Sequence, residues 1–214
     1  MKIDSPHKSS PQRSEFAPHV LSINTGIVQP LFVNTEANAQ SVMSAIRKAP
    51  LLGRVTVNRL GIAGDERADM SVHGGLDKAV YLYPHEHYAF WVAARERVLH
   101  RQESLSFGFM GENLTTKGLL ETALWIGDQV EIGELLLEVT EPRAPCFKFA
   151  ARMGYPQAIK HMLQSGFTGV YLKVITPADI TVGQTISIKP GPREVSIADI
   201  NRQRLKGRQR DLFP

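Results

Sequence analysis

Short apolar segments separated by glycine- or proline-containing turns follow one another along most of this 214-residue chain. Strands are expected at residues 19–24, 27–33, 54–60, 79–83, 123–126, 129–132, 135–140, 169–175 and 184–188. Helical patterns are confined to residues 85–97, residues 156–164 and the C-terminal end, so strands and helices do not alternate as they do in parallel α/β folds. Many short strands with few helices predict a mainly β fold and favour a closed or nearly closed β-barrel.

Composition divides the chain into three parts. Residues 1–17 are polar and rich in proline and serine, which predicts a flexible leader. Residues 18–192 contain the predicted strands and form the expected barrel domain, and residues 193–214 form a basic tail whose helix is opened by a capping box from Ser196 to Asp199. No apolar run approaches the roughly 18 residues of a membrane span, and the leader has no apolar core of a signal peptide. We therefore expect a cytoplasmic protein without membrane association.

The excess positive charge is concentrated in the tail. The chain has 25 basic and 21 acidic residues, a net charge of +4. Residues 201–214 contain five basic residues against Asp211, so the rest of the chain is neutral by count. A nucleic-acid-binding domain normally carries its positive charge on the folded surface, which disfavours nucleic acid as a partner. The tail is expected either to be a solvated helix end or to make an electrostatic contact with a partner.

The single cysteine, Cys146, lies in a segment with two prolines and two cations, residues 142–148. One cysteine excludes an intramolecular disulfide and a multi-cysteine metal cluster. If Arg143 and Lys148 approach the sulfur, they would lower its pKa and produce a thiolate, which is a nucleophile and a soft-metal ligand. The alternative is a buried, inert cysteine, which is a common fate of a lone cysteine.

Two glycine-containing loops are further candidates. In residues 72–78, Gly74 and Gly75 would let backbone N–H groups converge on an anion, and Lys78 would add charge. A tight turn that needs positive φ explains the same glycines. In residues 111–114, Gly111, Glu112 and Asn113 agree equally well with ordinary turn chemistry.

Other patterns are weaker. His85 and His87 suggest a metal pair, but residues two apart do not share a helix face, so surface or capping roles are favoured. Phe107, Phe109 and Phe147 lie in loop segments with Phe149 close by, and core packing explains them better than stacking on bases. Fingerprints of dinucleotide-binding, phosphate-loop, zinc-protease and serine-hydrolase sites are all absent from the sequence.

With these loops identified, residues 20–190 resemble the MOSC family, named for the C-terminal domain of molybdenum cofactor sulfurase. The resemblance is greatest to the small bacterial branch that includes the 6-N-hydroxylaminopurine resistance protein. Five stretches carry it in the family's order: GIAGDE at 61–66, VHGGLDKAV at 72–80, YPHEHY at 83–88, FMGENL at 109–114 and PRAPCFK at 142–148.

The resemblance implies a MOSC-type β-barrel with a cleft and makes Cys146 the key sulfur. In related amidoxime-reducing proteins the equivalent cysteine ligates molybdenum, which a pterin dithiolene also holds, and N-hydroxylated compounds are reduced. The resemblance therefore implies Cys146 as metal ligand and His73 as a residue that orients substrate or fixes its loop. It also implies cofactor-binding roles for the remaining candidates, Gly74, Gly75, Lys78, Gly111, Glu112, Asn113, Arg143 and Lys148.

These expectations combine into an oxidoreductase that binds molybdenum cofactor (Mo-molybdopterin) and reduces a small N-hydroxylated substrate such as a hydroxylaminopurine. Because the sequence contains no iron–sulfur or flavin motif, an external reductase must deliver the electrons. Longer members of the branch end in a three-helix domain, whereas the residues after Pro192 suffice for one helix. The alternative is a carrier that holds a persulfide on Cys146 or delivers the cofactor. A hydrolase using Cys146 and His73 is a third, weaker hypothesis.

Overall fold

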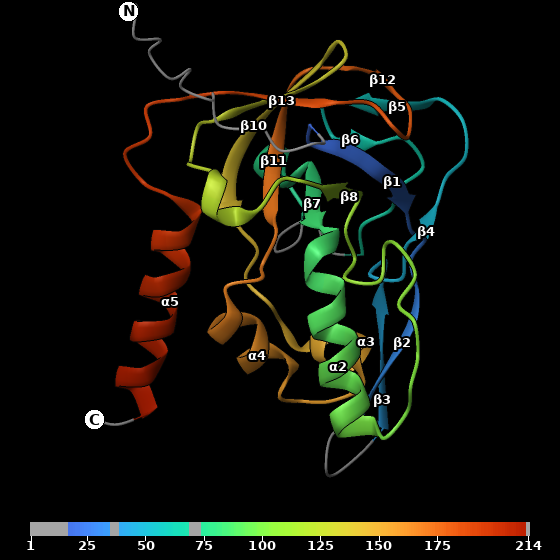
Figure 1. Cartoon of the computed structure of the whole chain (residues 1–214). Helices are drawn as coiled ribbons and strands as arrows, with labels where there is room; N and C mark the ends of the chain where they lie inside the picture. Colours follow the sequence, from blue (N-terminus) through green and yellow to red (C-terminus); the bar gives the residue numbers. More distant parts are fainter. Residues whose placement is uncertain (1–16, 35–38, 69–73, 213–214) are drawn as a thin grey trace, which may run out of the picture.

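The computed structural model describes residues 17–34, 39–68 and 74–212, and its largest element is an eight-stranded sheet (Figure 1). The strand order is β13-β9-β10-β11-β7-β8-β1-β4, and every neighbouring pair is antiparallel except β7 and β8. The strands are β1 (His19–Thr25), β4 (Ala49–Pro50), β7 (Val80–Pro84), β8 (Leu114–Lys117), β9 (Gln129–Ile132), β10 (Leu135–Pro142), β11 (Val170–Thr176) and β13 (Ile186–Lys189).

The remaining strands form two small sheets. One has the order β12-β5-β6, with strands Ala178–Ile180, Val55–Asn58 and Gly61–Ile62. The other is a hairpin of β2 (Gln29–Asn34) and β3 (Ala39–Ser44). The prediction of a mainly β fold with few helices is confirmed.

The expected closed barrel is not confirmed. The described strands fall into three separate sheets, and the large sheet ends at β13 on one side and β4 on the other. Contact between β1 and the segment leading into β13 consists of one isolated bridge, His19 to Thr185, and a few backbone hydrogen bonds, among them Val20 N–H to the Gln184 carbonyl at 3.0 Å. Strand β1 and the segment leading into β13 therefore approach each other without forming a continuous ladder.

Strand β7 separates two parts of the hydrophobic core, because all of its residues are buried. Since side chains alternate across a strand, Val80 and Leu82 join an aliphatic core between the strands, while Tyr81 and Tyr83 face an aromatic cluster. Helices α2, α3 and α4 supply most of the rest of that cluster, and Met110 and Tyr155 come from loops. The two tyrosines thus bring polar hydroxyl groups into an apolar region, where each requires a hydrogen-bond acceptor.

The four α-helices among the described residues have local signals at their ends. Helix α2 (Tyr88–Leu99) follows a short 3-10 turn, η2 (His85–His87), and α4 (Ala158–Ser165) ends at Gly166, which has φ +72°. Helix α3 (Phe147–Met153) begins directly after Cys146. Helix α5 (Ile197–Leu212) is opened by the predicted capping box, in which the Asp199 N–H donates to Ser196 Oγ at 3.0 Å. The expected C-terminal helix is confirmed.

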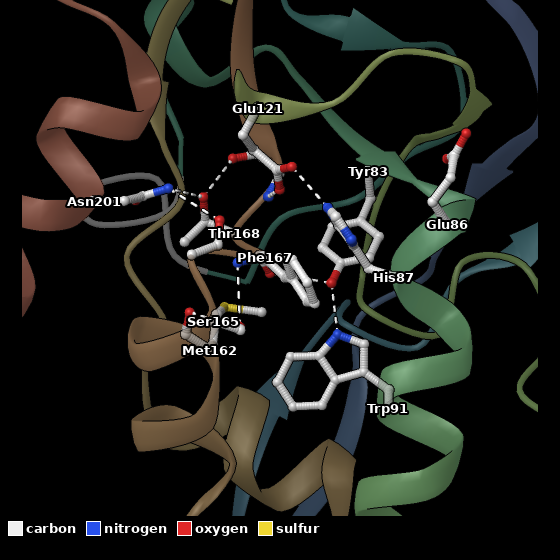
Figure 2. A network of polar contacts seen from close by, with 12 residues as sticks. Tyr83, Glu86, His87, Trp91, Glu121, Met162, Ser165, Phe167, Thr168 and Asn201 are labelled. Carbon is white, nitrogen blue, oxygen red and sulfur yellow. Dashed lines mark hydrogen bonds and ion pairs between the residues drawn. The ribbon is translucent and has the colours of Figure 1, made fainter. Parts of the chain in front are cut away.

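The loop of residues 166–169, between α4 and β11, is held by side chains from three elements (Figure 2). The Tyr83 hydroxyl donates to the Phe167 carbonyl at 3.1 Å and accepts from Trp91 Nε1 at 2.6 Å. From α5, Asn201 Nδ2 donates to the Gly166 carbonyl and to Thr168 Oγ1. These contacts fix the loop against β7, α2 and α5.

His87 belongs to the same network and is buried, which corrects the expectation of a surface role. It is the N-cap residue of α2, but its side chain makes no capping hydrogen bond. Its Nε2 lies 2.7 Å from Glu121 Oε2, and its ring stacks on Phe167 with centroids 3.8 Å apart. The other Glu121 oxygen accepts the Gly169 N–H at 2.7 Å. Because Glu121 is buried with His87, the histidine and the Gly169 N–H together supply the polar partners that a buried carboxylate needs.

Gly169 offers a test of this packing, with Gly183 as control. Both glycines have positive φ, so alanine would strain either backbone. A Cβ at Gly169 would also lie 2.5 Å from the Leu82 carbonyl oxygen, whereas one at Gly183 would meet nothing within 4 Å. We expect Gly183→Ala to lower the free energy of unfolding by about 1 kcal/mol and Gly169→Ala by at least about 3 kcal/mol. Urea unfolding measures both, and equal losses would contradict this account.

Candidate functional site

An open cleft with about 650 Å³ of empty space lies where β3, the loop after β6, β7, β10 and α3 meet. Six of the residues expected to form the site line it: Lys78, Gly111, Asn113, Arg143, Cys146 and Lys148. The remaining lining residues are Ser44, Ala45, Ile46, Lys48, Asp65, Glu66, Arg67, Ala68, Tyr81 and Tyr171. Segments far apart in the sequence therefore converge on one cavity.

Cys146 is placed in the cleft by the local structure on both sides of it. Strand β10 ends at Pro142, and Cys146 is the residue before α3, with its backbone extended and its carbonyl accepting the Phe149 N–H at 2.9 Å. The Phe149 side chain is fully buried and anchors this turn of helix in the aromatic cluster. The cysteine side chain is half-buried. It combines a fixed backbone with access from the cleft.

Arg143 is a buried cation at the wall of the cleft. Its guanidinium lies 4.9 Å from the Tyr81 ring centroid and 5.0 Å from that of Phe149, and it donates to the Met110 carbonyl. Its charge also interacts with Cys146. Burial raises the pKa of Tyr81, an effect that Arg143 opposes, so the phenol is neutral at pH 7 and the guanidinium keeps its full charge.

Lys48 and Asp65 form a buried ion pair in the cleft that the sequence reasoning did not single out. Asp65 also accepts the Gly26 N–H at 2.9 Å and Asn113 Nδ2 at 2.9 Å. Burial lowers the pKa of Lys48, and the charge of Asp65 opposes that change. Asp65 belongs to the stretch at 61–66 that resembles the MOSC family. A charged residue directly after a glycine in a turn was the signal that could have identified Asp65 as a site residue.

Asn113 and Glu112 are held by the protein itself. Asn113 Oδ1 accepts the Tyr81 N–H at 3.1 Å, and its Nδ2 donates to the Asn24 carbonyl as well as to Asp65. Glu112 is fully buried beneath the loop and is absent from the lining of the cleft. Its Oε1 accepts the Tyr88 hydroxyl, the Gly108 N–H at 2.9 Å and Thr115 Oγ1 at 2.8 Å. In the structure both side chains stabilise the loop that shapes the cleft.

The structure describes the predicted anion-binding loop of residues 72–78 from Gly74 onward. Lys78 lines the cleft and lies 3.4 Å from Glu141, with its ammonium 5.8 Å from the Tyr171 ring centroid. Gly74 and Gly75 lie outside the lining, and a Cβ at Gly75 would meet nothing within 4 Å. His73 lies outside the described residues. Anion binding by this loop stays a prediction.

The cleft is basic. Among the described residues, five basic and two acidic side chains line it. Within the described part of the chain, no group of three or more His, Cys, Asp and Glu side chains is arranged to hold a metal ion. None of the described helices is long and apolar enough to cross a membrane. The arrangement offers one sulfur atom beside several fixed positive charges, which suits an anionic ligand.

Replacement of Asp65 tests the ion pair. Asp65→Asn would leave the Lys48 ammonium buried without its counter-charge, and breaking a buried pair from one side costs about 3–5 kcal/mol. We therefore expect a loss of about 3 kcal/mol in the free energy of unfolding in urea. The control is Glu66→Gln at the exposed neighbour, which should lose well under half as much. A neutral effect of Asp65→Asn would show that the pair does not stabilise the fold.

Glu112 predicts a pH effect. Burial raises the pKa of its carboxyl, although its hydrogen bonds oppose this, so the folded state favours the protonated form. The stabilising contribution of the protonated form is complete below the unfolded pKa and is lost as pH rises through the folded pKa. Glu112→Gln keeps an oxygen acceptor and cannot ionise. The stability of the variant relative to wild type should therefore increase from pH 4 to pH 7 in urea titrations, and a constant difference would contradict the assignment.

Comparison with known proteins identifies the family. The MOSC domain model matches residues 69–187. Protein YiiM of Escherichia coli is 33% identical over 164 residues, which cover 77% of this chain and 72% of that protein. A Gibberella moniliformis protein named reductase is 37% identical over 152 residues, 71% of this chain but 26% of that protein. The crystal structure of YiiM from Geobacillus stearothermophilus superposes with a TM-score of 0.69 at 30% identity, covering 89% of this chain and 85% of the other. The chain belongs to the MOSC domain family, with YiiM proteins among its relatives.

Proposed function

We propose that this protein binds a molybdenum cofactor, Mo-molybdopterin, in the basic cleft and reduces N-hydroxylated compounds such as hydroxylaminopurines. One observation carries the proposal: the single cysteine of the chain lies in a cleft that, among the described residues, has five basic side chains. In the proposal Cys146 supplies one ligand to the metal, and the pterin dithiolene supplies others. The protein would act in the cytoplasm.

The donor set fits such a group. A thiolate is a soft ligand of the kind that binds metals through sulfur, and Cys146 can approach a ligand in the cleft because it is half-buried. The cofactor also carries a phosphate, for which Lys78, Lys148 and Arg67 are suitable partners. Gly111 brings backbone into the lining without a side chain. His73, Gly74 and Gly75 complete the proposed site from the loop before Lys78.

The chain's own residues would perform the electrostatic part of the reaction. When bound, the cofactor would supply two-electron redox chemistry at the metal. The overall conversion of a hydroxylamine to an amine consumes two electrons and two protons and releases one water molecule. Arg143 would stabilise negative charge near the Cys146 sulfur, since its guanidinium is fixed by two aromatic rings and a carbonyl. The neutral phenols of Tyr81 and Tyr171 would line the same wall.

Relatives support the oxidoreductase class. One relative is named reductase, and the matched segment is about a quarter of that protein. In that protein, further chain accompanies the segment that corresponds to this one. We propose that a separate molecule, an external electron-donor reductase, delivers electrons to this protein and is its partner.

Molybdenum content of Cys146→Ser tests the proposal. Wild type and variant would be purified without oxygen from a host that makes the cofactor, with Ala144→Ser as a control at an exposed neighbour. We expect near-stoichiometric metal in wild type and control, a loss of at least about tenfold in Cys146→Ser, and unchanged thermal unfolding. Reduction of 6-hydroxylaminopurine with a chemical electron donor should disappear together with the metal.

Two results would reject the proposal. Full metal content in Cys146→Ser would remove Cys146 from the metal. Absence of metal from all three proteins, with the added mass of one sulfur atom on Cys146 after incubation with a cysteine desulfurase, would establish the alternative sulfur carrier.

A further inference from the structure

Three arginines lie beside the cleft and are not part of its lining: Arg47, Arg95 and Arg152. Arg47 stands between Ile46 and Lys48, both of which line the cleft. Arg152 is four residues after the lining residue Lys148 on α3, and side chains at that spacing share a helix face. Positive charge therefore continues outward from the cleft along α3 and the segment of residues 46–48.

These groups converge on the loop that contains Phe109. The Arg152 guanidinium lies 3.9 Å from the Phe109 ring centroid, and its Nε donates to the Phe109 carbonyl at 3.2 Å. The Arg95 guanidinium lies 5.1 Å from the same centroid.

The glycines on either side of Phe109 bring Arg47 to the same edge. A Cβ at Gly108 would lie 2.9 Å from the Lys48 carbonyl oxygen, and one at Gly111 would lie 2.9 Å from Ile46 Cγ1. The loop is thus in direct contact with the residues on both sides of Arg47. Burial, with Arg47 and Arg95 nearby, lowers the pKa of Arg152 to about 10, so these charges are close enough to repel one another.

The charges at this edge differ from those inside the cleft in how they are compensated. Inside, Lys48 is paired with Asp65, and Lys78 lies 3.4 Å from Glu141. At the edge, Arg95 is paired with Glu103, but Arg47 and Arg152 form no ion pair with any described residue.

Buried Glu112 is the carboxyl that attracts Arg152 most, and burial raises its pKa, which weakens this compensation. Like charges held together without counter-charges destabilise the free protein, and a bound anion would remove that cost.

We propose that Arg47 and Arg152, here called the arginine edge, bind the phosphate of a nucleotide whose base enters the cleft. The inference rests on the proposed function and specifies its substrate class as N-hydroxylated nucleotides in preference to free bases. Guanidinium groups bind phosphate through paired, charge-assisted hydrogen bonds. The phosphate of the cofactor would use the cations inside the cleft, and the arginine edge would be left for the substrate.

Calorimetric titration of the purified holoprotein with adenosine 5′-monophosphate and with adenosine tests the edge without relying on turnover. At low salt we expect the nucleotide to bind at least about tenfold more tightly than adenosine, as charge-assisted contacts predict. This difference in affinity should shrink as salt is added. Arg47→Gln with Arg152→Gln should abolish the difference and leave adenosine binding unchanged.

Arg59→Gln is the matched control, because it removes one exposed arginine in the turn between β5 and β6, far from α3 in Figure 1. Because Arg152 also packs on Phe109, the exposed Arg47→Gln is also tested singly, and it should weaken nucleotide binding several-fold without changing urea unfolding. In turnover assays, kcat/KM for the 5′-monophosphate of 6-hydroxylaminopurine riboside should exceed that for the riboside by about tenfold in wild type and Arg59→Gln.

Several outcomes would overturn the inference. One is the absence of any preference for adenosine 5′-monophosphate over adenosine, including no binding of either. Another is release of a nucleoside monophosphate from the bound cofactor on acid hydrolysis, because the arginine edge would then hold a second phosphate of the cofactor. If protein that lacks molybdenum still prefers the nucleotide, phosphate binding by the arginine edge is supported and the proposed function is rejected. If a molybdenum-containing protein reduces riboside and nucleotide equally, the proposed function is supported and the role of the arginine edge is rejected.

Discussion

The buried guanidinium of Arg143 connects the segments from which the cleft is built. Removing a cation from water is costly unless its environment compensates the charge. Here the guanidinium lies 4.9 Å from the ring centroid of Tyr81 of β7 and 5.0 Å from that of Phe149 of α3, and the Met110 carbonyl accepts its N–H. One side chain thus connects the central strand, the helix that follows Cys146 and the loop of residues 107–113. Displacement of any of these elements would leave the charge without its partners, so the site and the fold are stabilised by the same contacts.

The surroundings of Arg143 also depend on the loop of residues 166–169, which Asn201 of α5 holds by hydrogen bonds (Figure 2). The Tyr81 hydroxyl donates to the Thr168 carbonyl at 2.7 Å, and the backbone N–H of Arg143 donates to the Gly169 carbonyl at 3.4 Å. From α5, Arg204 donates to the Pro142 carbonyl at 2.7 Å and lies 3.5 Å from Glu141. The described part of the basic tail is therefore attached directly behind the segment that carries Cys146, and it is more than a solvated helix end.

Local sequence signals predicted the features that depend on neighbours in the chain. The two-residue turn at Gly133, the capping box at Ser196 and the helix end at Gly166 require only nearby residues, and they were found as expected. The Lys48–Asp65 pair and the burial of Glu112 depend on partners brought together by folding, and no local pattern specifies them. Closure of the sheet likewise depends on how two distant edge strands approach. Several short strands indicate a β fold, but they do not determine whether its edges meet.

The local charge of the cleft could not be predicted from the net charge of the sequence. By count, residues 1–200 are neutral, which argues against a basic surface. In the folded chain, several acidic groups are paired with cations outside the lining of the cleft, for example Glu131 with Lys189, Asp128 with Arg193 and Asp199 with Arg202. Cations near the cleft are left with fewer acidic partners, so a neutral body contains a basic site. The field that a ligand experiences is set by which charges pair after folding, and net charge is a poor guide to it.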